Sequence, residues 1–186
     1  MIESQDRSGW FGASDTAYIM GNWKTKTFRN WFLQKMGLNT DKFSTVAMNA
    51  GTYYEHAILD HIGAPRKDHQ ILLPELLLRV NLDGDSHGKI FEIKTHKADK
   101  DFKVTKAYWQ QVQVQSFAKI AEEGETPEAC VVSYALTDAD YKDFFNPIDP
   151  ERIKVHPVSY DEMFINDYLP RLKYLGDCLR KGVFPE

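Results

Sequence analysis

Three charged side chains in one short stretch of the sequence have the types and spacing needed for phosphodiester chemistry. Asp83 ends the apolar run LLLRVNLD, and Glu92 and Lys94 lie two residues apart in the next run, GKIFEIKTH. Residues two apart in a strand point to the same face, and two strands joined by a hairpin lie about 4.8 Å apart. The spacing therefore predicts that Asp83, Glu92 and Lys94 converge on one small volume.

Such a cluster needs a cation, because carboxylates within about 4–6 Å raise each other's pKa. Mg²⁺ takes oxygen ligands in an octahedron and keeps several waters. Asp83, Glu92, a backbone carbonyl such as that of Ile93, and waters would form this shell around one or two ions, and Mn²⁺ could substitute. Lys94 would then orient or deprotonate an attacking water while the ion stabilises charge on the phosphate. Taken alone the motif is weak, and a solvent-facing hairpin with a cross-strand ion pair is the simpler interpretation.

The elements that must hold these residues can be predicted from apolar spacing, caps and turn residues. The patterns predict strands over 69–73, 76–83, 88–96, 128–136 and 152–158, and helices over 13–21, 25–38, 44–63, 105–123 and 159–182. The segment DGDSHG predicts a turn, with Asp85 as a turn residue or an outer-shell metal ligand. Ser14 or Asp15 is the expected N-cap of the first helix, and Pro170 is expected to kink the last. The order predicts an α/β (α+β) fold with a mixed central β-sheet flanked by helices.

Composition narrows the class of protein further. A chain of 186 residues predicts a single domain over 1–186. A net charge of −4 weakly disfavours nucleic acid as a partner, but lysines gather locally in segment 97–106. No apolar stretch approaches membrane-spanning length and the first residues lack a signal peptide's apolar core, so no membrane is expected and the predicted location is the cytoplasm. Cys130 and Cys178 are interpreted as buried small hydrophobes.

Four segments, in order, resemble the phage lambda exonuclease and YqaJ viral recombinase family of the PD-(D/E)XK nuclease superfamily. They are RSGWFGASDTAYIMG at 7–21, GTYYEHAI at 51–58, LDGD…EIKT at 82–95 and YWQQVQVQ at 108–115. Each is moderately specific, and their order makes the resemblance strong. It covers residues from about 7 to about 117; the last third carries no matching motif. The superfamily's Pro before the first Asp is replaced by Leu82.

The resemblance implies a restriction-endonuclease-like core and places the family's roles on matching residues. It makes Asp83, Glu92 and the Ile93 carbonyl metal ligands and Lys94 the catalytic lysine. It also brings Glu55 to the metals from the opposite side, and puts Gln111 and Tyr108 near the active site. Without the other segments, Glu55 would be interpreted as an exposed helix charge, and Gln111 as part of a polar helix face.

The resemblance further implies that Ser14 and Arg7 hold a 5′-terminal phosphate. A helix N-terminus with free N–H groups binds anions, and a guanidinium adds bidentate capture. Ser14 as a plain N-cap and Arg7 as a terminal charge remain the alternatives.

The expected function is a Mg²⁺-dependent exonuclease that digests linear double-stranded DNA 5′→3′, releases 5′-phosphomononucleotides and leaves 3′ tails for recombination. The resemblance implies DNA with free ends as partner, a homo-oligomer (a trimer in the family), a single-strand annealing protein, and a phage or prophage origin within bacterial cytoplasm. The alternatives are a structure- or sequence-specific endonuclease or RecB-like nuclease, and a non-catalytic DNA-binding module. An end-recognition role for Ser14 distinguishes the exonuclease from the endonuclease, and intact acidic residues argue against the module.

Overall fold

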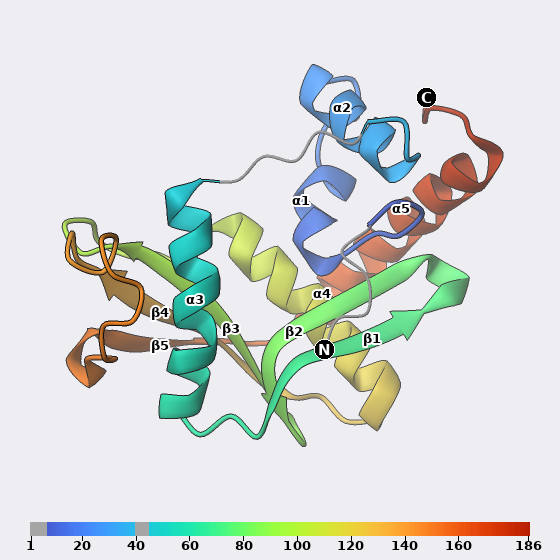
Figure 1. The fold of residues 1–186 in the computed structure, drawn as a ribbon. Coiled ribbons are helices and arrows are strands. Elements are labelled where there is room, and N and C mark those ends of the chain that lie inside the picture. Colours follow the sequence, from blue (N-terminus) through green and yellow to red (C-terminus); the bar gives the residue numbers. More distant parts are fainter. Residues whose placement is uncertain (1–6, 40–44) are drawn as a thin grey trace.

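A mixed five-stranded sheet forms the centre of the computed structural model, which describes residues 7–39 and 45–186, the side chains of 47 and 48 excepted. The strands lie side by side in sequence order (Figure 1). They are β1 (Arg66–Leu73), β2 (Leu78–Ser86), β3 (Lys89–Lys97), β4 (Glu128–Leu136) and β5 (Ile153–Val158). All five strands predicted from the sequence are therefore present. Strand β1 begins earlier than expected, and β2 ends later. Strand β2 also begins later, because Leu76 and Leu77 belong to a 3₁₀ turn (Pro74–Leu76) and its C-cap.

The connections explain why the sheet is mixed. Strands β1, β2 and β3 form consecutive antiparallel hairpins, and β4 pairs with β5 in the same way. Strand β3 runs parallel to β4, and the crossover between them contains helix α4 (Lys106–Glu123). Parallel neighbours need such a crossover because a short turn cannot return the chain to the same end of the sheet.

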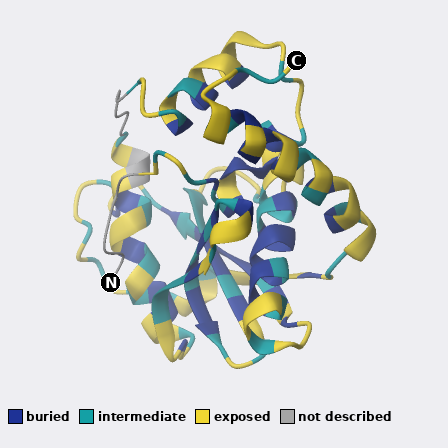
Figure 2. Cartoon of the chain, turned by 90° about the vertical axis from the view of Figure 1, so that its right-hand side faces the viewer, coloured by how far each residue is buried: buried dark blue, intermediate teal, exposed yellow. Residues whose placement is uncertain are grey.

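Helices cover both faces of the sheet. Helix α3 (Val46–His61) packs on one face over a core that includes Tyr54, Ile58 and Val132. The opposite face packs against α4, and a larger core extends from it to the helices α1 (Thr16–Ile19), α2 (Lys26–Lys35) and α5 (Glu162–Lys181). Figure 2 shows the buried residues gathered in the strands and on the inner sides of the helices. Helix α5 continues through Pro170.

Two glycines let α3 approach the strands that carry the charged residues. A Cβ at Gly84 would lie 2.2 Å from Leu59 Cδ2, so the Leu59 side chain would have to shift to admit one. A Cβ at Gly51 would lie 3.2 Å from Thr95 Oγ1 on β3. Because Glu55 follows Gly51 by about one helical turn, the close approach at Gly51 brings Glu55 next to the sheet.

The chain before α1 is docked on β2 as an extra extended segment. Phe11 N–H donates to the Leu77 carbonyl and Arg79 N–H donates to the Phe11 carbonyl, both at 2.8 Å. The Phe11 side chain is fully buried. This parallel pairing holds Phe11 alongside the start of β2, at the edge opposite β1.

The predicted first helix is shorter than expected and is capped differently. A 3₁₀ turn (Ala13–Asp15) with Gly12 as its N-cap precedes α1, and neither Ser14 nor Asp15 makes an N-cap side-chain bond to α1. The buried Asp15 carboxylate instead accepts from Gly12 N–H at 2.7 Å and Trp31 Nε1 at 2.8 Å, and pairs with Lys35 at 2.5 Å. Asp15 therefore joins this turn to α2, and Ser14 is left exposed.

Strand β2 does not end at Asp83 as predicted. It continues to Ser86, and the turn consists of His87 and Gly88. The pairing with β1 passes from Lys67↔Gly84 to His69↔Leu82, omitting the position of Asp83, and Asp68 opposite has a φ of 53°. Because of this local irregularity, Asp83 does not take part in the regular pairing between β1 and β2.

Two further predictions from the sequence concern membrane-spanning helices and the two cysteines. Within the described ranges, no helix is long and apolar enough to cross a membrane. Cys178 is buried as expected, Cys130 is only half-buried, and both are free thiols.

Candidate active site

One cavity of about 550 Å³ receives side chains from four separate parts of the chain. The segment before α1, helix α3, the strands β2 and β3, and helix α4 all line it. Eight of the nine residues singled out from the sequence are in its wall: Arg7, Ser14, Glu55, Asp83, Glu92, Ile93, Lys94 and Gln111. The ninth, Tyr108, lies beside Lys94, with its ring centroid 5.2 Å from Lys94 Nζ.

Asp83 lies where β2 and β3 separate. The β2–β3 pairing extends from Ser86↔Lys89 only to Gly84↔Phe91. Beyond it, the Asp83 carboxylate accepts a 2.8 Å hydrogen bond from Ile93 N–H. The N–H and C=O of one strand residue point to the same side, so the Ile93 carbonyl also faces the gap that Asp83 enters.

Glu92 is almost completely buried, and each of its oxygens accepts hydrogen bonds from neighbouring side chains. Oε1 pairs with the Lys94 ammonium and accepts from Gln111 Nε2 at 2.6 Å. Oε2 accepts from Gln115 Nε2. A carboxylate offers about four lone pairs, so Glu92 keeps acceptor capacity toward the cavity.

Lys94 is held as a cation between acidic and aromatic neighbours. Burial opposes its charge, but attraction to Glu92 and Asp83 outweighs that effect and raises the pKa of Lys94 above its ordinary value. The Tyr108 ring adds a cation–π contact. Phe102 stacks on Tyr108, with ring centroids 6.1 Å apart, and so supports it from behind.

Three carboxylates repel one another across the cavity. Burial, followed by repulsion from Glu92, raises the pKa of Glu55 to about 7. Burial, with repulsion from Glu92 and Glu55, holds the pKa of Asp83 well above its usual range. A protein that concentrates negative charge in this way has a site suited to a cation.

The donor set fits a hard divalent metal ion. Asp83, Glu92 and the Ile93 carbonyl offer oxygen atoms only, which suits Mg²⁺ or Mn²⁺ better than softer metals. Glu55 faces the same cavity, and it also forms a group with His56 and Asp68 in which the nearest ligand atoms all lie within 4.8 Å. The Glu55 carboxylate therefore has two groups of neighbours with which it could share a metal ion: the acidic residues of the cavity, and His56 with Asp68.

The cavity wall and its support also include residues that the sequence did not single out. Arg79 lines it together with Arg7 and Ser14. Arg79 and Asn81 precede Asp83 at two-residue intervals on β2, and this period of two was the available signal. Gln115 follows Gln111 by one helical turn, and this spacing was the signal for its contact with Glu92.

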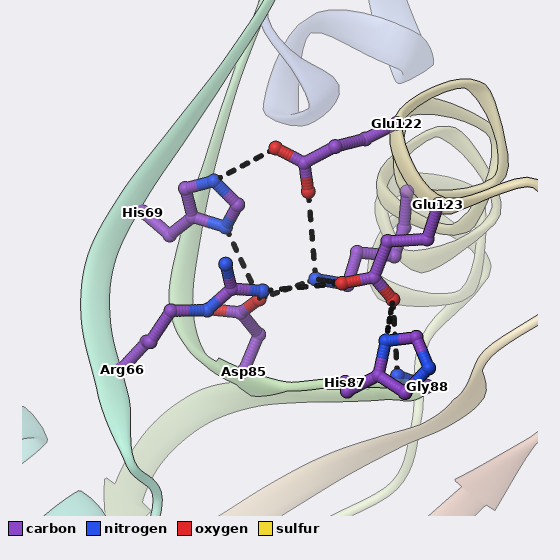
Figure 3. Close-up of polar contacts among 8 residues, drawn as sticks. Arg66, His69, Asp85, His87, Gly88, Glu122 and Glu123 are labelled. Atoms are coloured by element: carbon purple, nitrogen blue, oxygen red, sulfur yellow. Dashed lines mark hydrogen bonds and ion pairs between the residues drawn. The ribbon is translucent and has the colours of Figure 1, made fainter.

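Asp85 is not a turn residue, and it does not line the cavity. It lies in β2 and is completely buried, 2.6 Å from Lys119 Nζ on α4. Arg66 and His69 from β1 also pair with it, as Figure 3 shows. Glu122 and Glu123 complete this charge network, which surrounds the buried Asp85 and Lys119, from the end of α4. A short polar run in a sequence does not reveal that its carboxylate meets a buried lysine from a distant helix.

The fold is similar to that of solved exonucleases. The alkaline exonuclease LHK-Exo from Laribacter hongkongensis has a TM-score of 0.67 and 19% identity over 95% of this chain and 90% of its own. A phage-related exonuclease from Haemophilus somnus 129PT has a TM-score of 0.68 and 14% identity over 93% and 96%. A putative exonuclease from Eubacterium rectale has a TM-score of 0.58 and 13% identity over 94% and 82%.

These likenesses establish the fold. They agree with a core of the lambda exonuclease and YqaJ type, as the sequence motifs predict. No protein-family model matches the sequence, and no curated protein does.

Proposed function

We propose that this protein is a Mg²⁺-dependent deoxyribonuclease that digests linear double-stranded DNA from its 5′ ends. The observation that carries the proposal is the meeting of Asp83, Glu92 and Lys94 with Glu55 around one cavity. A solvent-facing hairpin would have no reason to bury Glu92 or to bring a third carboxylate from α3 to the same place.

The metal would be held by Asp83, Glu92 and the Ile93 carbonyl, with Glu55 approaching from α3. One or two ions, Mg²⁺ or Mn²⁺, would supply charge stabilisation for the phosphate undergoing attack. Ile93 N–H fixes one Asp83 oxygen, and the amides on α4 fix Glu92, so the chain presents its ligands already oriented.

Lys94 would orient or deprotonate the attacking water. Without a metal ion, attraction to Glu92 and Asp83 raises the pKa of Lys94 and favours its charged form. A divalent cation held by the same carboxylates would offset that attraction, so the charged form would orient the water and offset charge on the phosphate, and the neutral form would accept a proton. Tyr108 holds the ammonium from its other side, and Gln111 holds the carboxylate with which it pairs.

The proposed 5′-end preference rests on three other residues of the cavity wall. Arg7 and Ser14 would hold the terminal phosphate, with Arg79 adding positive charge beside them. Digestion from this end would release 5′-phosphomononucleotides and leave 3′ single-stranded tails for recombination. The exposed lysines of segment 97–106, which follows β3 and leads to α4, would line the DNA path.

The solved proteins with this fold support the same function, since they are described as exonucleases and LHK-Exo was also solved in complex with dAMP. From the resemblance to the phage family we further propose that the protein forms a homo-oligomer and works with a single-strand annealing protein. Its role would be in recombination and repair, in the bacterial cytoplasm.

The test compares linear and circular duplex DNA, each incubated with Mg²⁺ and either the native protein or Lys94→Ala. We expect loss of linear DNA only, faster from 5′-phosphorylated than from 5′-hydroxyl ends, and abolished in the variant. Nicking of circles would instead indicate an endonuclease. Cleavage of neither form, with Mg²⁺ or Mn²⁺, would indicate a non-catalytic DNA-binding module.

A further inference from the structure

Three polar residues on α4 lie one helical turn apart and are directed at the strands of the active site. Gln111 and Gln115 each donate to one oxygen of Glu92, and Lys119 pairs with Asp85 at 2.6 Å. Gln115 and Lys119 are both completely buried. A helix face buried against a sheet is normally apolar, so this polar row requires a reason.

Gln115 contacts both strands at the point where their backbones no longer pair. Its Nε2 donates to Glu92 on β3 and makes a longer contact, 3.4 Å, with the Asn81 carbonyl on β2. The ladder between these strands stops at Gly84↔Phe91. Backbone pairing therefore does not fix Glu92 relative to the segment of β2 that leads to Asp83, and the Gln115 amide bridges that gap.

The carbonyl oxygen of the Gln115 amide does not explain why a glutamine is buried at this position. This oxygen, Oε1, is buried and has no hydrogen-bond partner within residues 7–39 and 45–186. An unsatisfied buried acceptor destabilises the fold, and a methionine of similar shape would avoid that penalty. The NH₂ group is thus the part of Gln115 that explains its presence.

Gln113, on the same helix, shows what a structural glutamine looks like. It is also completely buried, but both ends of its amide are satisfied. Its Nε2 donates to the Ser159 carbonyl at 2.9 Å, and its Oε1 accepts from Asp161 N–H at 2.7 Å. Because Gln113 joins α4 to the start of α5 and directs its amide there, it is a matched control for Gln115.

We propose that Gln115 is a positioning residue of the active site, which holds the Glu92 carboxylate in register with Asp83 across the gap between β3 and β2. This inference rests on the proposed nuclease function. It assigns to Gln115 a role that acts through Glu92, without contact with the DNA.

The test compares Gln115→Met with Gln113→Met in thermal unfolding, in cleavage of linear duplex DNA and in calorimetric Mn²⁺ binding. We expect kcat and Mn²⁺ affinity of Gln115→Met to fall by roughly 10–100-fold at a temperature where it is folded, with KM for DNA unchanged. The variant should also melt lower, because Glu92 Oε2 loses its amide donor. Gln113→Met should melt lower and retain native kcat and Mn²⁺ affinity at a temperature where it is folded.

Two results would overturn the inference. One is a Gln115→Met protein with native kcat and native Mn²⁺ affinity. The other is a loss of kcat and Mn²⁺ affinity in Gln113→Met as large as that in Gln115→Met, as for two packing residues. If the native protein does not cleave DNA, the proposed function fails, and the Mn²⁺ affinity of Gln115→Met alone then decides the positioning role: a native value would refute it, and a weakened one would support it.

Discussion

Lys119 and Asp85 form a 2.6 Å ion pair in which neither side chain is exposed to solvent. The pair joins α4 to β2 two residues beyond Asp83. A buried pair of this kind need not add much stability by itself, but removing one partner leaves the other charge uncompensated. The pair is therefore a sensitive point of the fold, close to the active site but separate from it.

Lys119→Met should lower the free energy of unfolding toward the lower end of roughly 3–5 kcal/mol, because Arg66 still pairs with Asp85. Urea denaturation measures this change. Combining it with Asp85→Asn should recover part of the loss. Lys89→Met, which removes an exposed pair with Glu128, should change stability by less than about 1 kcal/mol. Equal losses of stability in Lys119→Met and Lys89→Met would contradict the burial of the Lys119–Asp85 pair.

Asp83→Asn should stabilise the protein in the absence of divalent ions while abolishing cleavage. The raised pKa of Asp83 means that its ionised form is unfavourable in the fold, and Asn removes that charge. Melting in a chelator should therefore occur at a higher temperature, and Mg²⁺ should no longer raise it. Activity should fall roughly a thousandfold or more, since metal charge stabilisation supplies several kcal/mol.

Asp60→Asn is the control for that experiment, because Asp60 is an exposed acid of α3 paired with Lys67. It should keep both the Mg²⁺-induced rise in melting temperature and the activity. A native Mg²⁺ response in Asp83→Asn would show that the metal binds elsewhere.

Glu55 should make stability depend on pH when no metal is bound. Its pKa is about 7 in the fold against 4.5 for the free side chain, so the protonated form is favoured by folding. The stability from this group is fully present below about pH 4.5 and is lost as the pH rises through about 7. Glu55→Gln should flatten the fall in melting temperature between about pH 5 and pH 8. An unchanged slope would exclude Glu55 as its source.

Ser14→Ala should reduce the preference for 5′-phosphorylated DNA ends. Losing a hydrogen bond to a charged phosphate should lower kcat/KM on phosphorylated ends by roughly tenfold or more and leave 5′-hydroxyl ends nearly unaffected. Thr27→Ala, at an exposed position on α2, is the control. An equal loss on both kinds of end would mean that Ser14 does not bind the terminal phosphate.

The lysines of segment 97–106 should control the salt dependence of DNA binding. Replacing Lys100 and Lys103 with Gln should reduce the slope of log K against log salt by roughly 0.9 for each phosphate that is no longer neutralised. Lys173→Gln with Lys181→Gln, on α5 away from the cavity, should leave the slope unchanged. A native slope in the Lys100 and Lys103 variant would place the DNA path elsewhere.

The sequence by itself determined the order and type of the elements, since the strands and helices follow from local period, caps and turn residues. It also determined which residues could form the site, because Glu92 and Lys94 share a strand face whatever surrounds them. Gly51 and Glu55 are likewise placed on one side of α3 by the helical repeat alone.

Only the tertiary structure decided the extent of β2 and the role of Asp85. Asp83 looks like a strand end because polar residues follow it, but Asp85 is buried against a lysine that lies far along the chain. The same holds for Gln115, whose amide has meaning only where β2 and β3 separate. Contacts between distant segments depend on how helices pack on the sheet, and that packing leaves no local pattern in the sequence.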